Sequence, residues 1–128
     1  MRLLPDRRYG GKRLVPTPEL VGCVLAQVPR GEVITLAELV ARLKQKYGGD
    51  RIGPQALDAS LRDLERDAAA CMREEHEPRV PMWRLVQNDG SVDPRSELKP
   101  LFSAARLREE GHCVAWDDDR WKVLDLHH

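Results

Sequence analysis

Apolar residues recur at helical spacing three times between residues 17 and 75. The first segment opens at Thr17 and Pro18, a capping residue followed by a proline at the first helical position. The second opens at Thr35, where Glu38 three residues later predicts a capping box. The third begins near residue 54, and its apolar positions fall at offsets of 0, 4, 7, 11 and 14: Leu57, Leu61, Leu64, Ala68 and Cys71. We therefore expect three helices, with Cys71 on the core face of the third.

Strand and turn patterns dominate the rest of the chain. Residues 79–86, RVPMWRLV, read as a strand, and residues 88–91, NDGS, as a tight turn. Residues 100–110 predict a last helix, stopped by a glycine. The segment HCVAWDDDRWKVL, residues 112–124, predicts a β-hairpin with three aspartates at its turn and a cross-strand pair, Trp116 and Trp121.

This order of elements predicts a fold that is α+β and mostly helical. It fits a winged helix-turn-helix domain with short strands and a C-terminal β-hairpin. We expect a basic N-terminal arm over residues 1–16 and a single domain over residues 17–128. Winged helices bind DNA, bind proteins or only provide a scaffold, so the fold does not choose among these functions.

Composition places the chain among ordinary globular domains. It has 128 residues, 41% hydrophobic and 33% charged, which suits one domain with one core. No apolar run approaches the roughly 20 residues of a membrane span, and no apolar segment follows the basic N-terminus as in a secretory signal. The expectation is a cytoplasmic protein with no membrane association.

Charge is unevenly distributed although the chain is formally neutral. Residues 1–16 carry five basic side chains and one acid, a net charge of +4, so the rest carries −4. A basic arm on an acidic body is suited to contact phosphates. The alternative is a solvated terminus without a ligand. The candidate phosphate contacts are Arg7, Arg8, Lys12 and Arg13.

Cysteine and histidine spacing gives no sign of a metal or a disulfide framework. The three cysteines are widely separated, no CxxC occurs, and the four histidines have no zinc-ligand spacing. We therefore expect no metal and no cofactor.

Three motifs carry a resemblance to a known family. They are VPRGEVITLAEL at residues 28–39, VPMWRLVQNDGSV at 80–92 and LREEGH at 107–112. Their order and spacing resemble the DNA-binding domain of O6-alkylguanine-DNA alkyltransferases, also called methylated-DNA–protein cysteine methyltransferases. The resemblance is closer to the cysteine-less alkyltransferase-like proteins. It extends over residues 17–116.

The resemblance implies that the reactive cysteine is missing. By position, Met82 stands for the alkyl-accepting cysteine, Trp83 for the histidine that helps to deprotonate it, and Glu110 for the glutamate that orients the histidine. A thioether has no thiolate form, and an indole N–H only donates. We expect no enzymatic activity, and expect Glu110 to serve as a cap or an ion-pair partner. A relocated nucleophile at Cys71 or Cys113 is the remaining enzymatic possibility.

The resemblance also implies a pocket for a flipped, alkylated base, with Leu36 in the place of a family tyrosine. The candidate lesion-pocket residues are Leu36, Met82, Trp83 and Arg84. Methionine and tryptophan can hold a base by stacking and soft sulfur contacts. The alternative is that Met82 and Trp83 fill the former cleft as core.

DNA contacts of the recognition helix are only partly retained. Gln55 stands where the family inserts an arginine into the duplex, and Arg62 matches a later basic residue. Asp58 replaces a small residue and would face phosphates unfavourably. If the alignment shifts across the insertion at residues 65–79, Arg51 is the alternative candidate for the arginine that enters the duplex.

These observations predict a non-enzymatic DNA-binding protein of the alkyltransferase-like type. It would recognise O6-alkylguanine-like bases in double-stranded DNA and act in DNA repair or damage signalling, alongside a repair or regulatory protein. The alternative is a degenerate family member that acts as a protein-interaction or regulatory winged helix, as its acidic body and acidic hairpin turn suggest.

Overall fold

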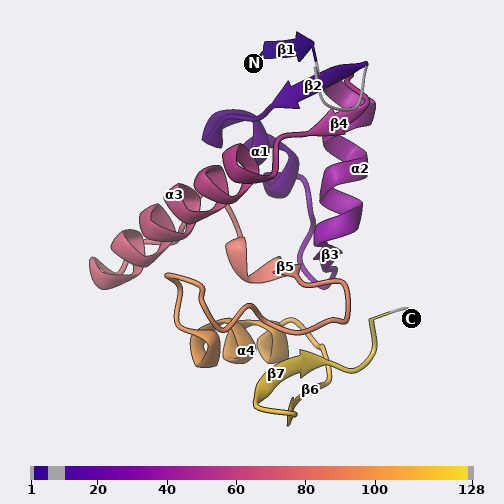
Figure 1. Ribbon diagram of the computed structural model, residues 1–128. Helices are drawn as coiled ribbons and strands as arrows, with labels where there is room; N and C mark the ends of the chain where they lie inside the picture. Colours follow the sequence, from indigo (N-terminus) through magenta and orange to yellow (C-terminus); the bar gives the residue numbers. More distant parts are fainter. Residues whose placement is uncertain (1, 6–10, 127–128) are drawn as a thin grey trace.

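The computed structural model describes residues 2–5 and 11–126 and has an α+β architecture (Figure 1). The helices found there are α1 (Pro18–Ala26), α2 (Leu36–Tyr47), α3 (Pro54–Arg73) and α4 (Pro100–Glu109). The strands are β1 (Arg2–Pro5), β2 (Lys12–Val15), β3 (Ile34–Thr35), β4 (Arg51–Ile52), β5 (Leu85–Val86), β6 (Val114–Asp117) and β7 (Arg120–Val123). The predicted fold class, mostly helical α+β with a C-terminal hairpin, is confirmed.

Helix positions follow the predicted pattern closely. α2 begins after Thr35, whose hydroxyl accepts from the Glu38 backbone N–H at 3.2 Å, while the Glu38 carboxylate accepts from the Thr35 N–H at 3.1 Å. The predicted capping box is therefore present. On α3 the predicted apolar stripe is buried as far as Ala68. Cys71 is only half-buried, because the last turns of α3 extend past the body of the molecule (Figure 1).

α1 and α3 pack closely at a glycine. A Cβ atom added to Gly22 would lie 3.3 Å from Leu64 of α3 and 3.4 Å from Val80. This approach buries Val21 and Leu25, which are fully inaccessible, within the main hydrophobic core. The apolar stripe of α1 thus forms one wall of the core that supports α3.

A three-stranded sheet at the N-terminal end was not predicted. β2 pairs with β1 in antiparallel fashion and with β4 in parallel, with Arg13 opposite Arg51 and Leu14 opposite Ile52. Leu14 is completely buried in the core. Lys12 and Arg13 therefore belong to a strand, whereas Arg7 and Arg8 lie outside the described residues.

The predicted strand over residues 79–86 is wrong for most of its length. Met82–Arg84 form η1, a single turn of 3-10 helix, and only Leu85–Val86 form β5, parallel to β3. A strand would point neighbouring side chains to opposite faces. In the 3-10 turn, Met82 and Trp83 are both buried, at 5% and 3% exposed.

The C-terminal hairpin is confirmed in detail. Trp116 pairs with Trp121, and their rings meet edge to face with centroids 5.3 Å apart. Asp118 and Asp119 both have positive φ, as a type I′ turn requires. None of the helices in residues 2–5 and 11–126 combines the length and the apolar character needed to cross a bilayer.

Candidate functional site

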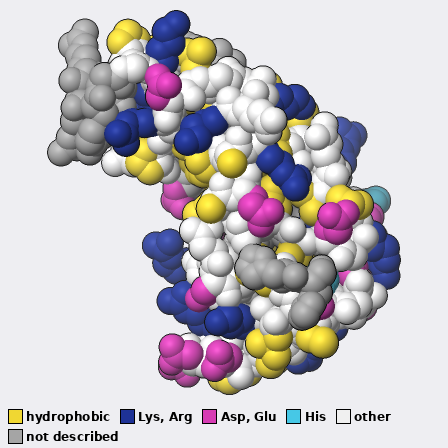
Figure 2. All heavy atoms as spheres, turned by 90° about the vertical axis from the view of Figure 1, so that its right-hand side faces the viewer, with side chains coloured by type: hydrophobic (Ala, Val, Ile, Leu, Met, Phe, Trp, Pro, Cys, Tyr) yellow, Lys and Arg dark blue, Asp and Glu magenta, His cyan; other side chains and the backbone are white. Residues whose placement is uncertain are grey.

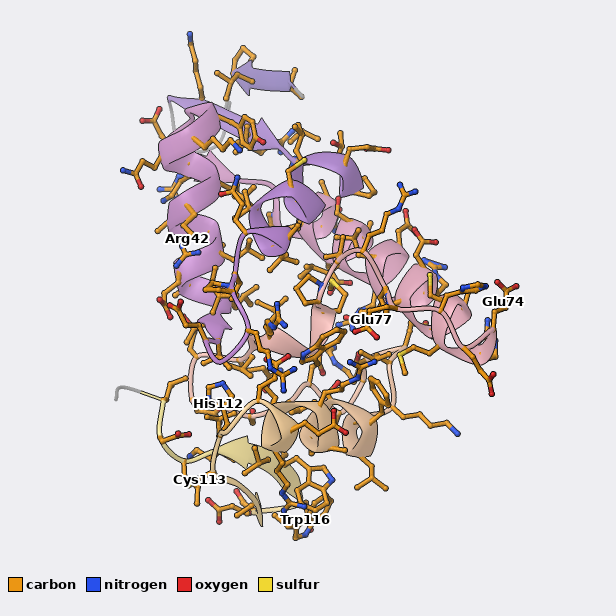
Figure 3. All side chains as sticks on the ribbon, turned by 180° about the vertical axis from the view of Figure 1, so that it is seen from behind. Arg42, Glu74, Glu77, His112, Cys113 and Trp116 are labelled. Carbon is orange, nitrogen blue, oxygen red and sulfur yellow. The ribbon has the colours of Figure 1, made fainter. Side chains whose placement is uncertain are left out.

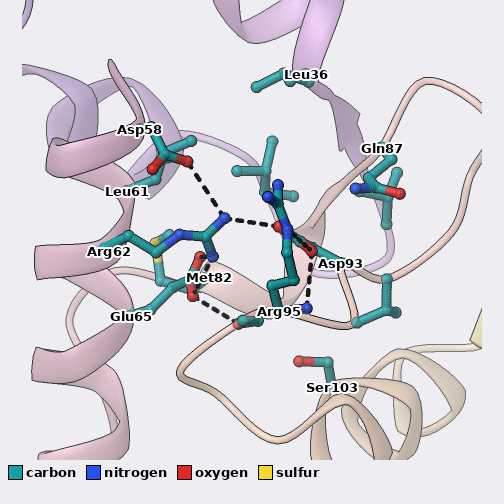
Figure 4. Close-up of a pocket in the computed structure, with 14 residues that line it drawn as sticks. Leu36, Asp58, Leu61, Arg62, Glu65, Met82, Gln87, Asp93, Arg95 and Ser103 are labelled. Carbon is teal, nitrogen blue, oxygen red and sulfur yellow. Dashed lines mark hydrogen bonds and ion pairs between the residues drawn. The ribbon is translucent and has the colours of Figure 1, made fainter. Parts of the chain in front are cut away.

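A cavity of about 120 Å³ lies between α3, the η1–β5 segment and the loop that follows β5 (Figure 4). We name it the Met82 cavity. Its apolar lining comes from Leu36, Leu61, Met82, Leu85, Val86 and Val92, and its polar lining includes Asp58, Arg62, Glu65, Gln87, Asp93 and Arg95. Apolar and charged side chains therefore line the same small cavity beside α3.

Two of the predicted lesion-pocket residues meet in this cavity. Met82 is 5% exposed, and Leu36 at the start of α2 is 36% exposed. Their side chains approach the same space from segments that are far apart in the sequence. The methionine offers a polarisable thioether with no proton to lose, so this position can contact a ligand but cannot act as a thiolate.

The other two predicted pocket residues do not line the cavity. The Trp83 Nε1–H donates to Oε2 of Glu110 at 3.0 Å, and the Arg106 guanidinium lies 4.7 Å from its ring centroid. Arg84 donates to Glu110 and, at 2.8 Å, to the carbonyl of Val28. Of the two alternatives for Trp83, these contacts favour packing in the core.

Glu110 is the centre of a buried polar network. Its side chain is 1% exposed and accepts from Arg84 Nε at 2.9 Å, from Arg84 NH2 at 2.8 Å and from the Gly31 backbone N–H at 3.4 Å. Burial alone would raise the pKa of Glu110, but the hydrogen bonds from Arg84 and Trp83 outweigh it, so the pKa lies below its ordinary value. The predicted ion-pair role of Glu110 matches this arrangement.

Arg62 is surrounded by three carboxylates on the wall of the cavity. Its NH1 donates to both oxygens of Glu65 at 2.9 and 3.0 Å, and its NH2 donates to Asp93 at 2.8 Å and to Asp58 at 3.3 Å. Burial lowers the pKa of Arg62, but the hydrogen bond to Asp93 and the surrounding negative charge raise it by more. The pKa therefore lies above its ordinary value, and the guanidinium stays charged. Figure 4 shows Arg62 reaching from α3 towards Asp93 on the opposite loop.

Asp93 and Glu65 are site residues that the sequence interpretation missed. Glu65 also accepts from Ser96 Oγ and from the Glu97 backbone N–H, both at 2.7 Å. Asp93 is 31 residues from Arg62, so no local spacing links the two. A signal existed for Glu65, which stands four residues after Leu61, on the buried side of α3.

Basic side chains gather at the start of α3. Arg13 and Arg51 are register partners, and the Cδ of Arg13 lies 3.8 Å from where a Cβ would stand on Gly53, the N-cap of α3. Lys12, Arg13 and Arg51 are all exposed, and we call them the α3 basic end. On the face shown in Figure 2, Lys and Arg side chains are spread over the upper part of the molecule with fewer acidic ones between them.

One face of α3 connects this basic end to the cavity. Gln55, Asp58 and Arg62 are spaced three and four residues apart, so they share a helical face. Gln55 is exposed on the first turn, whereas Arg62 is held at the cavity wall. Asp58 lies between them with a side chain 59% exposed, and it weakens the positive character of this face.

Within the described residues, no cysteine lines the Met82 cavity. Cys71 is half-buried and borders a separate groove that Leu64 and Val80 also line. Cys113 is exposed just before β6 (Figure 3). Among the same residues, no three His, Cys, Asp or Glu side chains group in a way that could hold a metal ion.

Comparisons with known proteins support the fold alone. No family model and no curated protein matches the sequence. Among solved structures, the chain is similar to S. pombe Atl1, crystallised in complex with damaged DNA that contains O6-carboxymethylguanine. The TM-score is 0.53 and the sequences are 20% identical, with 83% of this chain and 86% of that chain covered. The two proteins share a fold at low sequence identity.

Proposed function

We propose that this protein binds double-stranded DNA at a damaged base and does not react with it. The observation that carries the proposal is the position of Met82, a residue without a thiolate form, on the wall of a cavity beside α3. The fold likeness to a protein bound to O6-carboxymethylguanine DNA supports it. The ligand class we infer is an O6-alkylguanine-like base, and the role is DNA repair or damage signalling together with a further protein.

In the proposed complex, two parts of the molecule contact the DNA. The α3 basic end contacts phosphates, and Gln55 on the first turn of α3 reaches into the groove. The flipped base enters the Met82 cavity, where Leu36 and Met82 give apolar and sulfur contacts. Arg7 and Arg8, outside the described residues, add phosphate contacts in the same proposal.

No alkyl transfer is expected in this complex. Transfer needs a thiolate at the alkyl carbon and a group that has accepted the thiol proton. Met82 has no such proton, and the Trp83 indole is a donor already bonded to Glu110. The protein would hold the lesion and mark it for another protein.

Fluorescence anisotropy with an O6-methylguanine duplex and its unmodified twin tests the proposal. We expect tighter binding to the modified duplex, with an affinity that falls as salt is raised. Equal and undetectable binding of both duplexes at low salt would refute it. Mass spectrometry after the same incubation covers the enzymatic alternative, because a mass gain on Cys71 or Cys113 would show a relocated nucleophile.

A protein-interaction role is the second candidate, and one surface favours it. Trp116 is 59% exposed on the C-terminal hairpin, beside the turn that carries Asp117, Asp118 and Asp119 (Figure 3). Aromatic residues are enriched in protein interfaces, and polar side chains lie at the rim of such interfaces. Salt separates the two functions, because phosphate contacts weaken steeply with salt and an apolar interface does not.

A further inference from the structure

The Arg62–Asp93 ion pair joins the two walls of the Met82 cavity. Arg62 stands on α3, and Asp93 stands on the loop after β5, with 2.8 Å between NH2 of the arginine and Oδ2 of the aspartate (Figure 4). Both side chains are largely buried, at 18% and 23% exposed. The position expected to contact DNA is therefore occupied within the protein itself.

The carboxylates leave Arg62 little capacity for a phosphate. Its two terminal nitrogens already donate to Glu65, Asp58 and Asp93. Three carboxylates here face two guanidinium groups, those of Arg62 and of the exposed Arg95, whose Nε lies 3.7 Å from Asp93. The balance is one negative charge, so this wall has no net attraction for the DNA backbone. A guanidinium paired in this way contributes to DNA affinity only after a carboxylate has been displaced.

The three carboxylates are not equivalent. Glu65 is fixed by the Ser96 hydroxyl and the Glu97 N–H as well as by Arg62, which makes it an anchor. Asp58 lies on the same helix at 3.3 Å and is mostly exposed. Asp93 alone holds Arg62 from the opposite side of the cavity. Parting this pair leaves NH2 with the mostly exposed Asp58 alone, while NH1 stays on Glu65.

We propose that Asp93 is a specificity-determining residue, which holds Arg62 away from DNA until a base enters the Met82 cavity. In undamaged DNA no base enters, and Arg62 remains paired. A flipped damaged base displaces Asp93 from Arg62 while Glu65 keeps its bonds to Ser96 and Glu97, and the guanidinium then contacts the DNA. The inference rests on the proposed function and adds that Arg62 contributes to affinity only in the lesion complex.

Arg62→Gln is the first test, with binding measured by anisotropy over a salt series on both duplexes. We expect the affinity for the O6-methylguanine duplex to fall about tenfold and the salt slope to drop by about one phosphate contact. Affinity for the unmodified duplex should fall much less, with no change in its salt slope. Equal losses on both duplexes would overturn the inference, because Arg62 would then contact DNA whether or not a base is damaged.

Asp93→Asn is the second test, with Asp67→Asn as the control for the loss of one negative charge, because Asp67 is an exposed aspartate of α3 that lies outside the Met82 cavity. We expect Asp93→Asn to bind the unmodified duplex about fivefold more tightly, with a salt slope steeper by about one contact. Asp93→Glu should keep the wild-type slope. The increase should disappear when Asp93→Asn is combined with Arg62→Gln, since the group that is released is Arg62 and not Arg95, which is already 79% exposed.

The outcomes separate this inference from the proposed function. If Asp93→Asn matches Asp67→Asn, or if its increase persists without Arg62, the inference is wrong. If the wild-type protein fails to distinguish the two duplexes, the proposed function itself is wrong. Circular dichroism of each variant checks folding. If Asp93→Asn does not fold, the affinities of Arg62→Gln for the two duplexes decide the inference.

Discussion

Trp83 donates a hydrogen bond of 3.0 Å from its indole nitrogen to the buried carboxylate of Glu110. The sequence resemblance places these positions where the alkyltransferases have a histidine and the glutamate that orients it, and here the two side chains are hydrogen-bonded partners. The Trp83 indole only donates, so it cannot accept a proton from a neighbouring group, and its hydrogen bond to Glu110 is structural. Several outcomes depend on this contact and on the cavity beside it.

Replacing Trp83 by phenylalanine should lower stability and leave lesion recognition intact. The change keeps a ring against Arg106 but removes one donor from Glu110, which costs about 1–2 kcal/mol. Urea unfolding measures the loss, and anisotropy on the two duplexes measures recognition. Loss of discrimination with unchanged stability would instead place Trp83 in the binding site.

Replacing Glu110 by glutamine should destabilise the protein by roughly 3 kcal/mol at neutral pH, because the Arg84 charge loses its buried partner. The pKa of Glu110 is lowered in the folded state, so the unfolded chain binds its proton first as pH falls.

The stabilisation by Glu110 is therefore complete above the ordinary glutamate pKa of about 4.3 and is lost as pH drops through the lowered folded-state value. Urea unfolding from pH 7 to pH 3 should show that the free energies of unfolding of the wild type and of Glu110→Gln converge at the acid end. A constant difference across this range would contradict the ion-pair role.

Placing a cysteine at position 82 should not produce alkyl transfer. In Met82→Cys the thiol would face the cavity, but Trp83 cannot take its proton, so the thiolate fraction stays low. Mass spectrometry after incubation with an O6-methylguanine duplex should show unmodified protein on a timescale of minutes. Met82→Leu is the control for packing and should cost less than about 1.5 kcal/mol.

Arg13→Gln should weaken DNA binding equally for damaged and undamaged duplexes. Arg13 is exposed beside Arg51 at the α3 basic end, where it can reach a phosphate but not a base in the cavity. We expect the salt slope to fall by about 0.9. Arg73→Gln, an exposed arginine at the other end of α3, is the control and should have no effect. A change in lesion preference would argue against a phosphate contact.

Gly90→Ala should destabilise the turn after β5. Gly90 has φ of +88°, and an added Cβ would lie 2.8 Å from the carbonyl oxygen of Val123 in β7. The left-handed backbone costs about 1–2 kcal/mol for alanine, and the contact adds to it. Thermal unfolding measures the loss. If Gly90→Ala left the free energy of unfolding unchanged, the turn and the hairpin would be able to move apart with little loss of stability.

Local patterns in the sequence predicted local features well. Helix starts, the Thr35–Glu38 capping box and the Trp116–Trp121 pair each depend on residues a few positions apart. The first sheet and the Arg62–Asp93 pair depend on residues 38 and 31 positions apart, beyond the reach of a periodicity argument. The predicted strand over residues 79–86 was wrong because an apolar run of this length does not distinguish a buried strand from a 3-10 turn, and Met82–Arg84 form the turn.

The parallel pairing of β2 with β4 has a consequence for anyone shortening this chain. Leu14 contributes a fully enclosed side chain to the same interior that holds α3, and its neighbour Arg13 sits against the cap of that helix. Trimming back to residue 17, the boundary that hydrophobic periodicity proposes, would uncover the base of the helix that carries Arg62. Expression variants should therefore start upstream of β2.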